Sequence, residues 1–346
     1  MMLGDFMKIT IRDIAQKANV STTTVSRVLN NKPDVGKETV QKIKRLIEEL
    51  GYQPSSIARG LVLKKTYTIG LIIPDVCNPY FPELLRNVED EAKKYNYSTI
   101  FCNTDNIPEN EIKVINLLRS KQVDGLIISS SSDSKGTLEQ LTKMHEEHFP
   151  FVLIGMLGND ESYKKFSSVT IDNFESGYNA TKYLIDLGHR KIAHITGLPD
   201  LNTCIGRREG YKQALKDSNI IFKQEWLVHA GYTGESGYSC TKQLLHLQDR
   251  PTAIFTANDL LALGCFQALS EEKIAITNEI SLIGHDDVFT IYPKITTMRQ
   301  PKREIAQKSV EFLLRQINKD ESAFGASEVL HATCIVRKTT RKLNKD

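Results

Sequence analysis

Short apolar runs alternate with stretches of helical periodicity from residue 67 to residue 298, and this alternation constrains the fold more than any other feature of the chain. Such alternation is typical of buried strands in parallel sheets with helices on both faces. The runs lie at 67–75, 98–104, 124–131, 151–156, 169–171, 191–197, 226–230, 253–258, 281–286 and 295–298. Because the pattern restarts near residue 169, we expect an α/β body at 66–340. Its two parallel-sheet subdomains are predicted at about 66–166 with 299–328, and at about 167–297 with 329–340.

The first 53 residues follow a different pattern, that of short helices. Thr10 and Asp13 predict a capping box at the start of one helix, and Ser21 can cap a second helix at 22–29. A third helix is predicted from about residue 36 to residue 50, where Gly51 ends it. Two short helices joined by a three-residue turn match a helix-turn-helix. We therefore expect an all-α helix-turn-helix head at 8–53, after a leader at 1–7.

The outer side of the second helix carries Thr22, Thr23, Ser26 and Arg27. Short hydroxyls and a guanidinium suit base edges and phosphates in a DNA major groove. The formal net charge is +6 over residues 1–65, −7 over 66–336 and +4 over 337–346. A basic head on an acidic body indicates that only the head meets a polyanion, although a surface with clustered charges is the plainer alternative. The role of the basic tail at 341–346 stays open.

Several classes of protein are disfavoured by motifs that the sequence lacks. It has no apolar run long enough to span a membrane and no signal-peptide pattern, so we expect a cytoplasmic protein. The six cysteines are scattered, which favours reduced thiols over a disulfide framework or a zinc site. No dinucleotide-binding, P-loop, serine-hydrolase or zincin motif occurs, and the histidines at 145 and 148 have the wrong spacing for a zincin. We therefore expect no enzyme activity, no cofactor and no metal.

The segment at 54–65 is too short to form a stable helix in water, so we expect a hinge that orders only against a partner. Two motifs here and in the head carry a family resemblance. They are V-S-x-x-T-V-S-R-V-L-N at 20–30 and G-Y-x-P-S-S-I-A-R-G-L at 51–61. Residues 10–61 resemble the DNA-binding head and hinge of the lactose/galactose repressor (LacI/GalR) family.

The resemblance implies a DNA-binding role for nine residues of the head and hinge. Those that would read base edges are Thr22, Thr23 and Arg27, and those that would touch phosphates are Thr10, Ser21, Thr24 and Asn30. In the hinge, Leu61 would wedge between base pairs in the minor groove, with Ala58 on the groove floor. Val62 departs from family members that carry a basic residue after the wedging leucine, which leaves the flanking contact open.

Polar and aromatic residues stand directly after the predicted strands of the body. They are Asp75, Asn78, Tyr80, Phe81, Thr203, Arg207, Tyr232, Asn258, Asp259, Asp286, Asp287 and Gln300. Ligands of this fold class bind at the carboxyl ends of the strands. Amides, carboxylates, an arginine and aromatic rings suit a polyol, because hydroxyls need planar donors and acceptors. Taken singly, each of these residues is better explained as a helix cap or a core aromatic.

The body resembles the effector domain of the same repressors, which is similar to periplasmic sugar-binding proteins. The motifs are N-P-Y-F at 78–81, G-R-R-E-G-Y at 206–211, P-T-A-I-F-x-x-N-D at 251–259, S-L-I-G-H-D-D at 281–287 and T-T-M-R-Q-P at 296–301. The effector-binding residues that the resemblance implies are Asn78, Tyr80, Phe81, Thr203, Arg207, Tyr232, Asn258, Asp286 and Gln300. Gly155 and Met156 stand where many sugar-binding members have an Asp-Arg pair, and Leu201 stands where the purine-responsive member has an arginine. The first departure leaves the effector open, and the second argues against a purine.

These patterns together predict a homodimeric transcriptional regulator of the repressor type, associated with the bacterial nucleoid. It would bind a near-palindromic double-stranded DNA operator under allosteric control by a carbohydrate effector. The dimer face is predicted at 79–95 and 101–119. A phosphocarrier co-regulator is neither supported nor excluded, and the sign of the effector's action stays open. The alternatives are a periplasmic-type sugar-binding subunit and a sugar-acting enzyme with an appended DNA-binding head.

Overall fold

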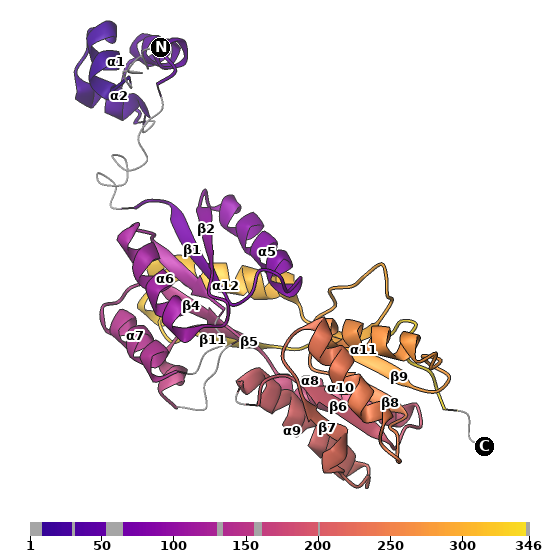
Figure 1. Cartoon of the computed structure of the whole chain (residues 1–346). Coiled ribbons are helices and arrows are strands. Elements are labelled where there is room, and N and C mark those ends of the chain that lie inside the picture. Colours follow the sequence, from indigo (N-terminus) through magenta and orange to yellow (C-terminus); the bar gives the residue numbers. More distant parts are fainter. Residues whose placement is uncertain are drawn as a thin grey trace, which may run out of the picture. The chain divides into compact units, whose positions relative to one another are not determined.

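The chain divides into two compact units, a head at Met1–Thr66 and a body at Tyr67–Asp346. The computed structural model describes residues 9–29, 32–52, 65–129, 134–155, 161–199 and 201–343 (Figure 1). The predicted hinge residues 54–64 and the predicted contact residue Asn30 lie outside these ranges. No helix in the described ranges is long and apolar enough to cross a membrane.

The described part of the head contains the three helices that the sequence predicts: α1 (Ile11–Ala18), α2 (Thr22–Leu29) and α3 (Lys37–Glu49). The Asp13 carboxylate accepts a hydrogen bond from the Thr10 backbone N–H (2.7 Å), and the Ser21 hydroxyl accepts one from the Thr24 N–H (3.0 Å). Asn19 adopts the left-handed conformation and ends α1. The core of the head is formed by Ile14, Ala15, Ala18, Val25, Val28 and Ile43. The predicted helix-turn-helix is therefore present.

The body contains two lobes, each built on a six-stranded sheet. The first sheet is entirely parallel and has the strand order β11-β5-β4-β3-β1-β2. Its strands are β1 (Thr68–Ile73), β2 (Ser98–Asn103), β3 (Gly125–Ile128), β4 (Phe151–Ile154), β5 (Ser168–Ile171) and β11 (Ser327–Leu330). Helices α5 (Tyr80–Lys94) and α12 (Lys302–Ile317) cover one face, and α6 (Pro108–Ser120) and α7 (Lys135–Glu146) cover the other.

The second sheet has the corresponding order β12-β10-β9-β8-β6-β7, and only its edge strand β12 runs antiparallel to its neighbour. Its strands are β6 (Ile192–Thr196), β7 (Leu227–His229), β8 (Ala253–Thr256), β9 (Ser281–His285), β10 (Thr296–Arg299) and β12 (Thr333–Ile335). Helices α8 (Asn173–Asp186) and α9 (Asn202–Asp217) cover one face, and α10 (Gly234–Leu245) and α11 (Asp259–Glu271) cover the other. Short 3₁₀ turns lie at Glu161–Lys165, Gln224–Trp226 and Glu321–Ala323. The fold class predicted for the body is confirmed.

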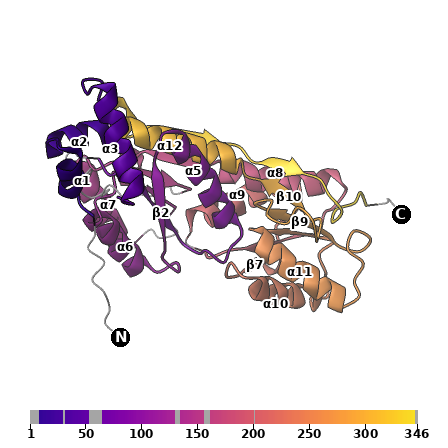
Figure 2. The same ribbon diagram turned by 90° about the horizontal axis from the view of Figure 1, so that it is seen from above.

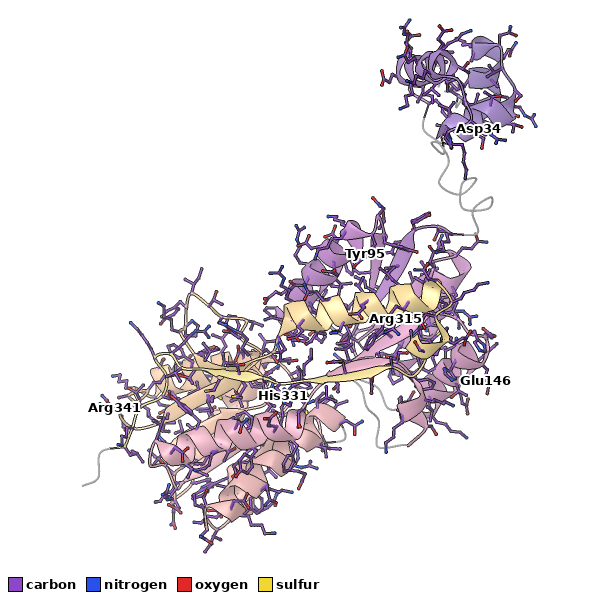
Figure 3. All side chains as sticks on the ribbon, turned by 180° about the vertical axis from the view of Figure 1, so that it is seen from behind. Asp34, Tyr95, Glu146, Arg315, His331 and Arg341 are labelled. Atoms are coloured by element: carbon purple, nitrogen blue, oxygen red, sulfur yellow. The ribbon has the colours of Figure 1, made fainter. Side chains whose placement is uncertain are left out.

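The chain passes between the lobes three times, at residues 172, 300–301 and 331–332. Figure 2 shows the lobes side by side, and Figure 3 shows His331 on the third crossover. The predicted subdomain boundary at residue 167 is wrong for one strand. β5 pairs in parallel with β4 and with β11, and so completes the first sheet. A buried strand has the same apolar pattern in either sheet, so periodicity alone does not assign it.

The segment after β12 is part of the second lobe as far as residue 343. The Arg341 N–H donates to the Ser281 hydroxyl (3.2 Å), and the Leu343 N–H donates to the Leu187 carbonyl (2.8 Å). Residues 341–343 of the predicted basic tail therefore pack against the second lobe. Their backbone N–H groups give hydrogen bonds to the Leu187 carbonyl at the end of α8 and to the Ser281 hydroxyl at the start of β9.

Candidate functional site

A cavity of about 140 Å³ lies between the lobes, at the carboxyl ends of the strands of both sheets. An engineered protein cavity of about this volume holds a benzene molecule, so the space suits one six-membered ring. All nine residues predicted to bind an effector line it: Asn78, Tyr80, Phe81, Thr203, Arg207, Tyr232, Asn258, Asp286 and Gln300. Six strand-end segments that are far apart in the sequence thus meet in one place, as expected for this fold class.

The other lining residues were not among the nine predicted effector-binding residues, although the sequence singled out Asp75, Gly155 and Leu201. They are Pro74, Asn106, Ser129, Ile154, Ile171, Asn173 and Asn202, together with Gly155, Leu201 and the strand-end residue Asp75. Ser129 follows β3 and Asn173 follows β5, so the strand-end rule applied to every strand would have found them. Asn173 was missed because the rule was not applied to the predicted strand at 169–171.

Arg207 reaches the cavity because α8 and α9 pack at close range. A Cβ atom on Gly210 would lie 2.0 Å from the Phe174 carbonyl oxygen, so only glycine fits there. The side chain of Arg207 is buried, donates from Nε to the Asn173 Oδ1 (2.9 Å), and donates from Nη1 to the Ala257 carbonyl. These bonds fix the guanidinium before any ligand arrives, which lowers the entropic cost of binding.

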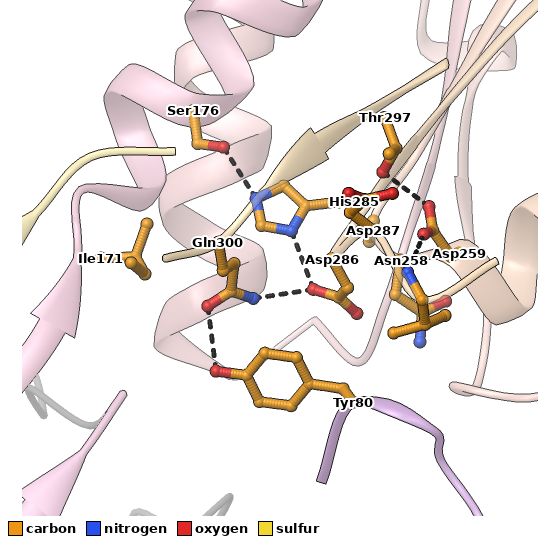
Figure 4. A network of polar contacts seen from close by, with 12 residues as sticks. Tyr80, Ile171, Ser176, Asn258, Asp259, His285, Asp286, Asp287, Thr297 and Gln300 are labelled. Atoms are coloured by element: carbon orange, nitrogen blue, oxygen red, sulfur yellow. Dashed lines mark hydrogen bonds and ion pairs between the residues drawn. The ribbon is translucent and has the colours of Figure 1, made fainter. Parts of the chain in front are cut away.

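Asp286 is held by its neighbours in a strained backbone conformation directly after β9. Its φ of 110° is unfavourable for a residue with a Cβ and costs about 1–3 kcal/mol. Its Oδ1 accepts a hydrogen bond from the Gln300 Nε2 (2.7 Å) and lies 2.9 Å from the His285 Nδ1 (Figure 4). Across the cleft, the Tyr80 hydroxyl on α5 donates to the Gln300 Oε1 (3.1 Å). A chain of hydrogen bonds therefore links the two lobes at the cavity.

Asn258 offers a donor that lacks a partner within the described structure. Its Oδ1 caps α11 by accepting from the Leu261 N–H (2.9 Å), while its buried Nδ2 makes no hydrogen bond to any described residue. An unsatisfied buried donor costs about 1–3 kcal/mol. Because Asn258 lines the cavity, a ligand oxygen can meet this donor.

Two further buried aspartates stand beside the cavity without lining it. Burial and the nearby Asp286 carboxylate raise the pKa of Asp259 to about 7, and its oxygens accept from Thr297 Oγ1 (2.7 Å) and the Val288 N–H (2.9 Å). Burial alone would raise the pKa of Asp287, but ion pairs with Arg299 (2.6 Å) and Arg337 (2.5 Å) hold it below its ordinary value. These two groups tie the turn after β9 to its surroundings.

Aromatic rings from both lobes complete the cavity wall. The Tyr80 and Phe81 rings meet edge to face with centroids 5.1 Å apart. Burial raises the pKa of the Tyr80 and Tyr232 hydroxyls well above the ordinary value, so both remain protonated donors at neutral pH. Rings beside polar groups offer a stacking surface for the C–H face of a ligand ring.

In the head, the outer face of α2 is open to solvent. Thr22, Thr23 and Arg27 are exposed, and Arg27 pairs with Asp34 in the turn that precedes α3. The hydroxyl of Ser21 lies 2.9 Å from that of Thr24. Thr10 is exposed next to α1. Asn30, Ala58 and Leu61, the remaining predicted contact residues, lie outside the described residues.

Comparisons with known proteins agree on one family for both units. Residues 10–55 match the family model described as bacterial regulatory proteins, lacI family. Residues 66–334 match the model described as periplasmic binding proteins and sugar binding domain of the LacI family.

Individual relatives resemble the chain over nearly its whole length. Catabolite control protein A of Priestia megaterium is 36% identical over 91% of this chain and 94% of its own. The HTH-type transcriptional repressor PurR of Mannheimia succiniciproducens is 34% identical over 96% of this chain and 99% of its own. A Lac repressor dimer, solved bound to operator and the anti-inducer ONPF, has a TM-score of 0.86 at 25% identity, over 96% of this chain and 99% of its own.

Proposed function

Since the chain belongs to the LacI family of bacterial regulatory proteins, we propose that its body binds a sugar or sugar derivative and so controls DNA binding by its head. The protein is a transcriptional repressor that binds an operator under the control of a small molecule, and it is not an enzyme. The proposal adds the class of the ligand and the residues that bind it.

The observation that carries the proposal is the buried Nδ2 of Asn258, which has no hydrogen-bond partner among the described residues and lies in a cavity lined by fixed polar groups. Arg207 and Asn258 supply donors, and the Asp286 carboxylate supplies an acceptor. A ring hydroxyl both donates and accepts, so a polyol satisfies all three groups together. Tyr80 and Phe81 cover the less polar face of the ring. These groups support a ligand of the size of a monosaccharide. Because PurR is among the relatives, the test compares sugars with purine bases.

For DNA, we propose that Thr22, Thr23 and Arg27 read base edges in the major groove. They are exposed on one face of α2, which is the second helix of the helix-turn-helix. Thr10, Ser21, Thr24 and Asn30 would bind phosphates, with Ala58 and Leu61 in the minor groove. The protein would act as a homodimer on a near-palindromic operator, as two-fold symmetry requires. Since its DNA target lies in the bacterial cytoplasm, we propose that it acts there on the nucleoid.

Control of the head follows from the three crossovers between the lobes. A ligand that contacts both walls of the cavity favours closure of the lobes, because closure completes its contacts. Closure moves the first lobe, from which the chain continues to the predicted hinge at 54–65. The sequence predicts a hinge too short to be stable alone, and such a hinge would respond to a small displacement, so effector and operator affinities would be coupled reciprocally.

The test combines ligand binding with DNA binding by the full-length protein. A thermal-shift screen uses D-ribose, D-glucose, D-galactose, their phosphates, and purine bases. Operator sequences are selected from a random duplex library, and the ligands that raise the melting temperature are titrated into the selected complex. We expect a sugar to bind and to change operator affinity, and the titration gives the sign. Binding of a purine alone, or no selected palindrome, contradicts the proposal.

The DNA-reading role is tested by Arg27→Ala with Arg45→Ala as its matched control. Both residues are exposed arginines of the head, but Arg45 lies on α3. Loss of a base contact costs about 1–3 kcal/mol, so R27A weakens the selected operator about 10- to 100-fold and relaxes the sequence preference. R45A should leave that preference intact. Equal effects of the two substitutions would mean that Arg27 contributes charge alone.

A further inference from the structure

A buried histidine, His285, stands between the helix α8 and the ligand-facing carboxylate of Asp286. Its side chain is fully buried, with Nε2 2.7 Å from the Ser176 Oγ and Nδ1 2.9 Å from the Asp286 Oδ1 (Figure 4). Neither Ser176 nor His285 lines the cavity. The order Ser-His-Asp is that of a hydrolytic triad, but the serine here is itself buried and does not reach the cavity, so it cannot act as a nucleophile.

The donors and acceptors in the series of hydrogen bonds from Ser176 to Tyr80 can be assigned by starting from the Asp286 carboxylate. An ionised carboxylate only accepts, so the Nδ1 of His285 and the Nε2 of Gln300 both donate to the Asp286 Oδ1. Burial lowers the pKa of His285 to about 4, with a smaller contribution from Arg207, so the ring is neutral at pH 7. Its Nε2 is then an acceptor, and the Ser176 hydroxyl donates to it. At the other end, the protonated Tyr80 hydroxyl donates to the Gln300 Oε1.

Two donors on one oxygen leave the other oxygen of Asp286 for the ligand. Within the described structure Oδ2 accepts no hydrogen bond, and Asp286 lines the cavity. We propose that His285 is a positioning residue that, held by Ser176, fixes the Asp286 carboxylate so that Oδ2 accepts a hydrogen bond from a ligand hydroxyl. This inference rests on the proposed function, because it assumes that the ligand is a polyol.

The hydrogen-bonded series Ser176–His285–Asp286, called the relay below, makes the site selective for ligands that donate a hydrogen bond from a hydroxyl. Because His285 and Gln300 occupy Oδ1 from inside the protein, Asp286 cannot turn to offer both oxygens to a guanidinium or an amidine. It presents one acceptor in one direction. A ligand hydroxyl at that position can be replaced by hydrogen or by a methoxy group only with loss of the bond.

The first experiment needs no ligand. In full-length protein with ¹⁵N-labelled histidine, nuclear magnetic resonance reports which ring nitrogen of His285 carries the proton, with H285N identifying the resonance. We expect the Nδ1–H tautomer, unchanged from pH 6 to pH 8, and we expect its chemical shifts to move in Ser176→Ala. An Nε2–H tautomer, or titration of the ring in this range, overturns the proposal.

The second experiment measures the affinity for D-ribose and D-glucose by calorimetry. His285→Phe keeps a ring but removes the donor, and we expect about a tenfold loss of affinity. His285→Asn should recover part of this loss, because its amide can donate to the same carboxylate. The matched control is His189→Phe: His189 is also buried between two hydroxyls, Thr252 Oγ1 and Ser281 Oγ (both 3.0 Å), but does not line the cavity or contact a residue that does. We expect H189F to bind within twofold of the wild type.

The outcomes separate this inference from the proposed function. Unchanged affinity in H285F, or an equal loss in H285F and H189F, overturns the positioning role. If H285F does not fold, S176A, which removes only the partner of Nε2, takes its place with an expected loss of about threefold, and unchanged affinity again overturns the role. If neither sugar binds the wild type, these sugars are not effectors, and the tautomer measurement alone decides whether the relay exists.

Discussion

The two lobes of the body share one strand order but differ in what they bury. In the first lobe, the described buried charged residues are Glu111 and Lys302, and Lys302 stands at the crossover end of α12. The second lobe buries Arg207, Asp259, Asp286 and Asp287, together with His189, His194 and His285. Buried charges are retained where they are paired and hydrogen-bonded, and these are. The comparison teaches that the buried charged groups beside the cavity are concentrated in the second lobe, whereas the first lobe contributes uncharged side chains, including the aromatic rings of Tyr80 and Phe81, and the half-buried Asp75.

Helix packing gives the largest expected difference between the lobes. Gly210 on α9 of the second lobe has no room for a Cβ, which would meet the Phe174 carbonyl oxygen at 2.0 Å. Gly136 on α7 of the first lobe would place a Cβ 3.2 Å from the flexible end of Ile112. We expect Gly210→Ala to destabilise the body by about 3 kcal/mol and Gly136→Ala to be neutral or stabilising by up to about 1 kcal/mol. Urea unfolding checks both, and similar values for the two variants would contradict the close packing of α8 on α9.

Two neighbouring aspartates of the second lobe, Asp286 and Asp287, allow ligand binding and fold stability to be tested separately. Asp286→Asn removes the charge that faces the cavity, and we expect a 10- to 100-fold loss of sugar affinity, because a charge-assisted hydrogen bond contributes about 1.5–3 kcal/mol. Asp287→Asn is the control: it loses pairs with Arg299 and Arg337 and should lower stability while leaving affinity within a few fold. Calorimetric titration with thermal unfolding separates the two effects. Loss of binding in D287N alone would reverse the assignment.

The buried carboxyl groups of the second lobe also predict that the stability of the protein depends on pH. Asp259 has a folded pKa of about 7, above its ordinary 3.8, so the folded state holds a proton that the unfolded chain releases. The contribution of Asp259 to stability therefore falls as the pH rises from about 4 to about 7. We expect the stability of wild type relative to Asp259→Asn to decline from pH 5 to pH 8 in urea unfolding.

The control for this pH dependence is D287N. The pKa of Asp287 is below its ordinary value, so its contribution is lost only as the pH falls below about 4, and it should be constant from pH 5 to pH 8. A parallel decline for both variants would show that the slope does not come from Asp259.

The smallest expected effect concerns the contact between the lobes. Tyr80→Phe removes the hydroxyl that donates to Gln300 and keeps the ring against Phe81. A neutral hydrogen bond contributes about 0.5–1.5 kcal/mol, so we expect a two- to tenfold loss in sugar affinity and a weaker effect of the sugar on operator binding. Phe81→Leu keeps that hydrogen bond and loses the aromatic edge. Unchanged coupling in Y80F would mean that the first lobe closes through the ligand alone.

Much of the site was predictable because each strand-end residue is positioned by its own strand. The nine predicted effector residues follow six different strands, yet all of them line one cavity. Ser129 and Asn173 also follow strands, so the same rule covers them, but the hydrogen-bond partners behind the cavity wall depend on contacts between distant segments. His285, which contacts the Asp286 carboxylate, is held on its other side by Ser176, which is 109 residues away in sequence. No local pattern identifies such partners.

The sequence by itself determined the head completely at the level of helices, because caps such as Ser21 and apolar spacing act within a few residues. It also determined that the body is α/β, that the family is LacI/GalR, and which strand-end residues gather. The tertiary structure alone decided which sheet each buried strand joins, that residues 341–343 bind the second lobe, and which oxygen of Asp286 remains for a ligand. The physical reason is the separation along the sequence of the groups that interact. Helix caps and strand patterns are set by near neighbours, whereas sheet pairing and buried hydrogen-bond relays are set by groups that meet only after the chain has folded.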